Sequence, residues 1–113
     1  MRVHQGEIVE VNFLLPNGEF KPHPTIVLSS NNVNHFEDAF IGVMISSSAP
    51  IDEFSYELHN DMLLKPTKKP CQVRCQLLSL IPESQVIGKH GGIKRKYLKE
   101  IIAKINDSVL NVE

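Results

Sequence analysis

The chain contains no tryptophan and only two tyrosines among its 113 residues. This shortage of aromatic side chains argues against an adaptor that binds peptides in an aromatic groove. No apolar run is long enough to cross a bilayer. Glu7 and Glu10 interrupt the apolar residues near the N-terminus, unlike the continuous apolar region of a secretory signal. We therefore expect a cytoplasmic protein without a membrane partner.

An excess of positive charge is also missing, since the net charge is -1. This value excludes a globally basic nucleic-acid binder, so any nucleic-acid site must be a local patch. The chain has no nucleophile elbow, no paired carboxylates and no cluster of metal ligands. Residues 91–92 form a glycine pair, but they lack the spacing of a dinucleotide-binding loop. We expect neither a cofactor nor a metal ion.

Only two cysteines are present, Cys71 and Cys75. If they share a strand, they lie on one face about 13 Å apart, because a strand rises about 3.3 Å per residue. That separation is too large for a disulfide. A zinc site would need two more ligands, for which His59 and His90 are nearest in sequence. The favoured interpretation is that both cysteines are small buried apolar residues.

What the chain does contain is a series of short apolar segments typical of β-strands. They cover residues 6–13, 23–30, 40–48, 54–58 and 71–81. Residues 16–18 predict a turn within a polar loop over 15–22. A single helical turn is expected after residue 30, with Ser30 or Asn31 as its cap. We predict at least five strands, mostly antiparallel.

The clearest alternation falls in residues 71–81. One face of that segment is predicted to belong to the core and carries Cys71, Val73, Cys75 and Leu77. The other face is predicted to be partly wet and carries Gln72, Arg74, Gln76 and Leu78.

The only convincing helix follows the glycine pair at 91–92. Its apolar stripe consists of Leu98, Ile101, Ile102, Ile105 and Val109. The fold class is therefore mainly β: a compact antiparallel barrel packed by one C-terminal α-helix.

Two of these segments present groups suited to phosphodiester chemistry. Lys21 and His23 stand at the start of the second strand, and residues 46–48 end the third strand with three hydroxyls. A small barrel can bring such positions together. Pro22 and Pro24 follow Lys21 and His23 and favour an extended backbone at each. The two cations are therefore expected to be well positioned.

In order along the chain, residues 6–9, 24–29, 43–47 and 73–77, followed by the amphipathic helix, resemble the PemK/MazF toxin family. The resemblance covers nearly the whole chain and implies one domain over residues 1–113, with an SH3-like barrel and added helices. It implies a homodimeric, cytoplasmic growth inhibitor from a type II toxin–antitoxin system. Such toxins are metal-independent endoribonucleases that cut single-stranded mRNA. The antitoxin's C-terminal tail blocks the RNA groove.

The resemblance also assigns roles to residues. The family's catalytic arginine precedes the proline of the second strand, where this chain has His23, and its catalytic threonine corresponds to Ser46. Histidine can both accept and donate a proton near neutral pH, whereas arginine stays protonated. We hypothesise that His23 is the acid/base group, Lys21 supplies fixed charge and the Ser46 hydroxyl binds the scissile phosphate. Further substrate-binding candidates are Ser47, Arg74 and Gln76.

Replacement of the arginine leaves a second interpretation open. The chain fits a catalytically inactive protein of the same fold that binds RNA or DNA, or that binds DNA gyrase as the related CcdB branch does. Arg74 and Gln76 fit an ordinary solvated strand face or a dimer contact equally well. Residues 46–48 by themselves fit the polar exit of a strand. A cleavage assay separates the nuclease from the binder.

Overall fold

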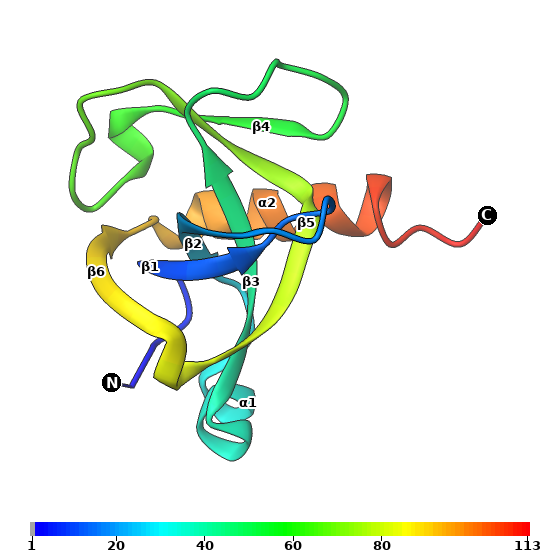
Figure 1. The fold of residues 1–113 in the computed structure, drawn as a ribbon. Helices are drawn as coiled ribbons and strands as arrows, with labels where there is room; N and C mark the ends of the chain where they lie inside the picture. Colours follow the sequence, from blue (N-terminus) through cyan, green and yellow to red (C-terminus); the bar gives the residue numbers. More distant parts are fainter. Residues whose placement is uncertain (1) are drawn as a thin grey trace.

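The structure, a computed structural model, describes residues 2–113. These residues form six strands: β1 (Glu7–Leu14), β2 (Phe20–Val27), β3 (Ala39–Ser46), β4 (Ser55–Leu58), β5 (Cys71–Pro82) and β6 (Val86–Gly92). The α-helices are α1 (Asn31–Glu37) and α2 (Arg95–Ser108). Two single 3-10 turns, η1 (Asn60–Met62) and η2 (Glu83–Gln85), precede β5 and β6. Figure 1 shows their arrangement.

All six strands belong to one antiparallel sheet in the order β4-β5-β3-β2-β1-β6. The sheet curls strongly, and β5 and β6 bend around the central strands (Figure 1). Its two ends approach each other where Leu63 forms an antiparallel bridge with Ile93. The Leu64 amide also donates to the Gly92 carbonyl at 2.8 Å. The predicted mainly β, barrel-like fold is confirmed, although a short bridge rather than a strand ladder joins its edges.

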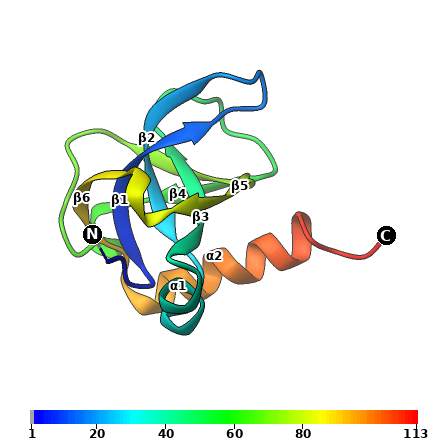
Figure 2. The same ribbon diagram turned by 60° about the horizontal axis from the view of Figure 1, so that its bottom comes forward.

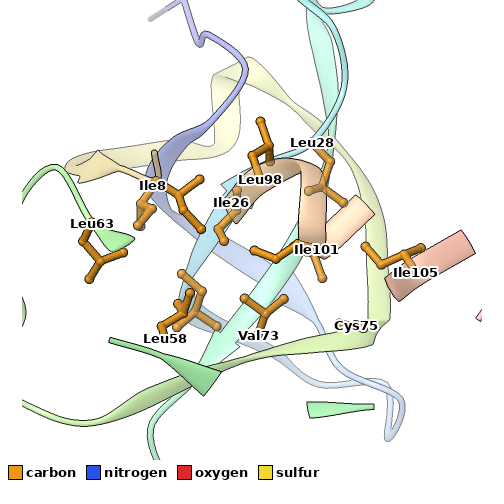
Figure 3. Packing of buried hydrophobic residues seen from close by; sticks show 13 residues of the cluster. Ile8, Ile26, Leu28, Leu58, Leu63, Val73, Cys75, Leu98, Ile101 and Ile105 are labelled. Atoms are coloured by element: carbon orange, nitrogen blue, oxygen red, sulfur yellow. The ribbon is translucent and has the colours of Figure 1, made fainter. Parts of the chain in front are cut away.

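Helix α2 packs against the curled sheet, and the C-terminal tail runs away from it (Figure 2). Leu98, Ile101 and Ile105 are buried on its inner face, which confirms the predicted apolar stripe. Figure 3 shows these side chains turned toward Ile26 of β2 and Val73 of β5. Within residues 2–113, neither α-helix has the length and apolar character needed to cross a membrane.

A second apolar cluster lies on the other side of β1. Alternate residues Val9, Val11 and Phe13 are almost fully buried there, together with Phe40. Because successive strand residues point to opposite faces, Ile8 and Glu10 are directed to the side that bears the groove described below. The two apolar clusters pack against opposite faces of β1. Glu10 lies between the buried residues Val9 and Val11.

Short helix α1 begins as the sequence predicts. The Ser30 hydroxyl accepts a hydrogen bond from the Val33 amide at 3.3 Å, so Ser30 is the N-cap. The helix ends at Asp38, whose φ of 50° turns the chain directly into β3.

Strand β2 begins at Phe20, earlier than the predicted start at residue 23. Its early residues pair only with β1, because β3 pairs with β2 over Thr25–Val27 alone. Pro22 and Pro24 are therefore tolerated, since the side facing away from β1 has no ladder to complete. The loop predicted over 15–22 is shorter than expected.

Strand β6 is an element that sequence patterns did not predict. Its seven residues include Gly88, Gly91 and Gly92, which are poor strand formers. Pairing with β1 creates the strand, and the register slips twice along it, as β-bulges produce. Gly91 has a φ of 100° and lies against Lys65, so it suits a position without a side chain.

Candidate functional site

A groove of about 350 Å³ lies across one face of the sheet. Its floor is apolar and contains Ile8, Ile45, Leu58 and Leu63. Its polar lining residues are Glu10, His23, Ser46, Ser47, Ser48, Thr67, Lys69, Cys71 and His90. This volume lies within the usual range of ligand-binding pockets. The groove therefore combines an apolar base with cationic, hydroxyl and imidazole groups.

Neighbouring strands supply the most reactive of these groups. Across the sheet order β3-β2-β1-β6, the groove receives Ser46, His23, Glu10 and His90 in turn. Each residue comes from a different strand, so the sheet sets the relative positions of their backbones. Sites carried on strands are held more precisely than sites carried on loops.

His23 lies half-buried on β2, opposite Val11 of β1. The prediction that it meets the Ser46 end of β3 is confirmed, because both line the groove. Lys21 lies two residues earlier on β2 and is exposed, 3.6 Å from the Glu19 carboxylate. It is not among the groove-lining residues. The charge of Lys21 can therefore act on a ligand in the groove only from outside the groove lining.

The Ser46 side chain is buried, with 7% of its surface exposed. Its hydroxyl oxygen accepts hydrogen bonds from the amides of Ser48 at 3.3 Å and Ala49 at 3.1 Å. Two amides occupy the acceptor side of the oxygen, so the O–H is free to donate to another group. The arrangement suits an anion in the groove. Ser47 is exposed and lines the same groove.

Arg74 does not lie on a wet face, and that prediction is wrong for both Arg74 and Gln72. Both side chains are buried because the loop between β3 and β4 folds over them. The Arg74 guanidinium donates to both carboxylate oxygens of Asp52, at 3.0 and 2.8 Å. It also donates to the Ser55 hydroxyl and to the Gln72 side-chain oxygen, at 2.9 and 3.0 Å. We call these four side chains the Arg74 network.

The Arg74 network has a clear electrostatic signature. Hydrogen bonds from Arg74, and then from the Phe54 amide, lower the pKa of Asp52 to about 2. The Gln72 amide group donates to the Ala49 carbonyl at 2.8 Å, which ties the network to the loop beyond Ser46. Arg74 is thus held by protein groups and is not among the groove-lining residues.

Gln76 also lies away from the groove. It is half-buried and borders a separate hollow beside the β1–β2 turn, together with Phe13, Leu15 and Gly18. Its side-chain oxygen is buried and has no hydrogen-bond partner within residues 2–113. The structure therefore separates Gln76 from His23 and Ser46.

Several polar groove residues, among them Lys69, Glu10 and His90, were not among the candidates for catalysis or substrate binding. Lys69 precedes β5. Glu10 and His90 are joined across β1 and β6, with 3.3 Å between the Glu10 Oε2 and His90 Nε2 atoms. No local sequence pattern identifies this pair, because the pair depends on strand β6, whose glycines weaken the sequence signal for a strand.

The cysteines behave as predicted in one respect. Both are free thiols; Cys75 is buried and Cys71 is half-buried at the groove wall. Burial raises the pKa of each thiol. His59 lines a neighbouring hollow with Lys68 and Lys69. In the part of the chain that the structure describes, no three His, Cys, Asp or Glu side chains cluster as metal ligands would.

Comparisons with solved structures identify the same fold. MazF from Deinococcus radiodurans superposes with a TM-score of 0.79 at 16% identity, covering 98% of this chain and 99% of that one. A MazE–MazF structure from the same organism has a TM-score of 0.73 at 18% identity, covering 100% and 99%. An endoribonuclease in complex with its cognate antitoxin, from a mycobacterial species, has a TM-score of 0.75 at 10% identity, covering 98% of each chain.

At these identities the structural likeness shows the fold alone. No curated protein matches the chain at the level of sequence. Residues 4–109, however, match the family described as the PemK-like, MazF-like toxin of type II toxin–antitoxin systems. That match spans nearly the whole chain and agrees with the resemblance found in its motifs. The chain belongs to the PemK-like, MazF-like toxin family.

Proposed function

We propose that the protein is an endoribonuclease that cuts single-stranded mRNA in the cytoplasm and thereby acts as a toxin. The observation that carries this proposal is the meeting of His23 and Ser46 in one groove, with Lys69 beside them. An imidazole, a hydroxyl and a cation are the groups that RNA cleavage by the 2′-hydroxyl requires.

The roles follow from the chemistry of each group. The reaction needs a base for the 2′-hydroxyl proton, donors for the phosphate oxygens and an acid for the departing 5′-oxygen. Ser46 is positioned to donate because two amides already occupy its oxygen as acceptor. Lys69 supplies positive charge, and His23 transfers a proton. Protein groups therefore account for every proton and charge, so the proposed reaction needs no metal ion.

We further propose that a cognate antitoxin binds this groove through its C-terminal tail. By description, one similar structure contains MazE with MazF from Deinococcus radiodurans, and another contains a mycobacterial endoribonuclease in complex with its cognate antitoxin. An apolar floor edged by Lys69 suits an extended peptide with apolar and acidic side chains.

A homodimer is also part of the proposal. A pair of exposed apolar side chains supports it: Ile41 and Leu80 lie opposite each other on β3 and β5, at 42% and 66% exposure. Their burial in a second copy would remove this surface from water.

The test is cleavage of a long single-stranded RNA by purified protein in EDTA, with His23→Ala and Lys21→Ala alongside. We expect wild type to cut, His23→Ala to lose about 10²-fold or more in rate, and Lys21→Ala to lose less because it lies outside the groove. Wild-type rates in both variants would contradict the assignment of His23.

Replacement of the family arginine by His23 supports one alternative function. A protein that binds RNA, DNA or gyrase without cutting would leave the RNA intact and retain it in a binding assay. That result would overturn the nuclease proposal and keep the family assignment.

A further inference from the structure

The Glu10–His90 pair is the least expected part of the groove. Strand β6 pairs with β1 so that Val9 faces Lys89 and Glu10 faces Gly88. Alternation then places Lys89 on one side of the sheet and His90 on the other. The groove-side pair has 3.3 Å between Glu10 Oε2 and His90 Nε2, with His90 half exposed. A similar pair, Lys89 with Glu7 at 3.1 Å, lies outside the groove lining.

The Glu10 carboxylate determines how His90 presents its ring. An ionised carboxylate can only accept hydrogen bonds, so the neutral ring donates to it through the Nε2 hydrogen. The other nitrogen, Nδ1, then carries the lone pair. This is the arrangement in which a carboxylate orients an imidazole as a base and stabilises the imidazolium that forms.

We propose that His90 is the catalytic base of the reaction and that Glu10 is its positioning residue. This inference rests on the proposed endoribonuclease function. His90 Nδ1 accepts the proton of the 2′-hydroxyl while the 2′-oxygen forms a bond to phosphorus. The bond from phosphorus to the 5′-oxygen breaks, and protonated His23 donates a proton to that oxygen.

The products balance with the substrate. One RNA strand ends in a 2′,3′-cyclic phosphate, and the other begins with a 5′-hydroxyl. His90 finishes protonated and His23 finishes neutral, so exchange with water restores both. Ser46 donates to a non-bridging phosphate oxygen throughout. Two imidazoles on β2 and β6 place the acid and the base on two strands, with β1 between them.

Other charged and titratable groups share the surroundings of His90. Glu10 faces it from β1, His23 lines the same groove from β2, and Lys69 and Cys71 line it from the segment that enters β5. Lys65 lies against the adjacent Gly91. Glu10 is the one carboxylate among the groove-lining residues, so it is the group that compensates a positive charge on His90.

The test is the pH dependence of cleavage by wild type, His90→Gln, Glu10→Gln and Lys89→Gln. The cut position in a long RNA is mapped first, and a short oligonucleotide spanning it becomes the substrate. We expect a bell-shaped pH profile of kcat/KM for wild type. His90→Gln should lose the ascending limb of that profile, and its rate should fall by at least about 10²-fold. Glu10→Gln should move the ascending limb and lower kcat more than it raises KM.

A second substrate carries sulfur in place of the leaving 5′-oxygen, which no longer needs an acid. It should restore cleavage by His23→Gln and leave His90→Gln impaired. Lys89→Gln is the matched control on the opposite side of β6 and should keep the wild-type profile. A 2′-deoxy substitution at the cut position gives an uncut probe, which His90→Gln should bind as wild type does.

The outcomes separate this inference from the proposed function. If wild type cuts and His90→Gln retains the bell-shaped profile, the role of His90 is overturned and the endoribonuclease stands. If the sulfur substrate restores His90→Gln, His90 is not the base. If wild type does not cut, both proposals fail together.

Discussion

Two polar regions lie on either side of the loop between β3 and β4, and they are built differently. In the Arg74 network the guanidinium is buried and donates to three other side chains. In the groove, Lys69 and His90 are exposed, and the Ser46 hydroxyl keeps a free donor. One region has its hydrogen bonds satisfied within the protein, and the other leaves them available to a ligand.

The comparison shows why a charged residue on a strand is a poor guide to function by itself. Arg74 was the one charged residue on the strand face expected to be partly wet, yet it is buried and pairs with Asp52 of the loop that folds over it. Buried charges are tolerated when they are paired and hydrogen-bonded, as Arg74 is. Ligand-binding residues are recognised by polar groups that have no hydrogen-bond partner within the protein.

Ser46 lines the groove and also holds the start of the loop to which Gln72 of the Arg74 network donates, and its replacement has the largest expected effect. Ser46→Ala removes a donor to the phosphate and should lower cleavage about 10²-fold. It also leaves the Ser48 and Ala49 amides without their acceptor, which should cost about 1 kcal/mol of unfolding free energy. Ser46→Thr keeps the hydroxyl and serves as the control in RNA cleavage and urea unfolding. Unchanged cleavage by a destabilised Ser46→Ala would leave only the structural role.

Arg74→Met should disrupt the Arg74 network and leave the groove intact. Loss of the buried guanidinium leaves Gln72 and Ser55 without their partner and should cost about 2 kcal/mol, or about 10 °C in Tm. Arg95→Met, at an exposed position on α2, is the matched control for thermal unfolding. An unchanged Tm together with weakened RNA binding would instead make Arg74 a substrate-binding residue.

Lys69→Gln changes a groove residue and should have a smaller effect, which is a weaker dependence of RNA binding on salt. A lysine that contacts a phosphate of single-stranded RNA contributes about 0.7 to the slope of log Kd against log salt concentration. We expect that reduction in fluorescence anisotropy titrations with 2′-O-methyl RNA, which is not cut. Lys99→Gln on α2 should leave the slope unchanged, and equal slopes in all three proteins would exclude Lys69 from the RNA contact.

The smallest expected effect is the acid dependence of stability. The pKa of Asp52 is about 2 in the folded protein, below its ordinary value of 3.8. The unfolded chain therefore takes up this proton first, and the stability due to Asp52 is complete above about pH 4 and lost as the pH falls toward 2. Urea unfolding of wild type and Asp52→Asn should show a difference that shrinks over this interval. Parallel curves would show that Arg74 does not favour the ionised carboxylate.

Sequence patterns predicted the parts of the fold that depend on local chemistry. Short apolar segments located five of the strands, Ser30 or Asn31 was expected as a cap, and the stripe through Leu98, Ile101 and Ile105 located α2. Strand β6 was not predicted, because glycine weakens the local preference for a strand. It forms only through its pairing with β1. His90 was missed for the same reason.

The candidate site was predicted in part. His23 and Ser46 share a groove as expected, because antiparallel pairing of β2 with β3 brings the two strands together. Alternation along β5 identified two faces but not which distant segments cover them. Burial of Arg74 and the separate hollow at Gln76 follow from those long-range contacts. The catalytic roles of His23 and Ser46 stay predictions.

The sheet order has a consequence for when the protein can act. Glu10 and His90 are 80 residues apart in the chain, and β6 must add to β1 before they meet. During translation, a nascent chain therefore has no complete groove until residues through Gly92 have left the ribosome. Any activity that needs both residues begins only after β6 has been synthesised and has paired with β1.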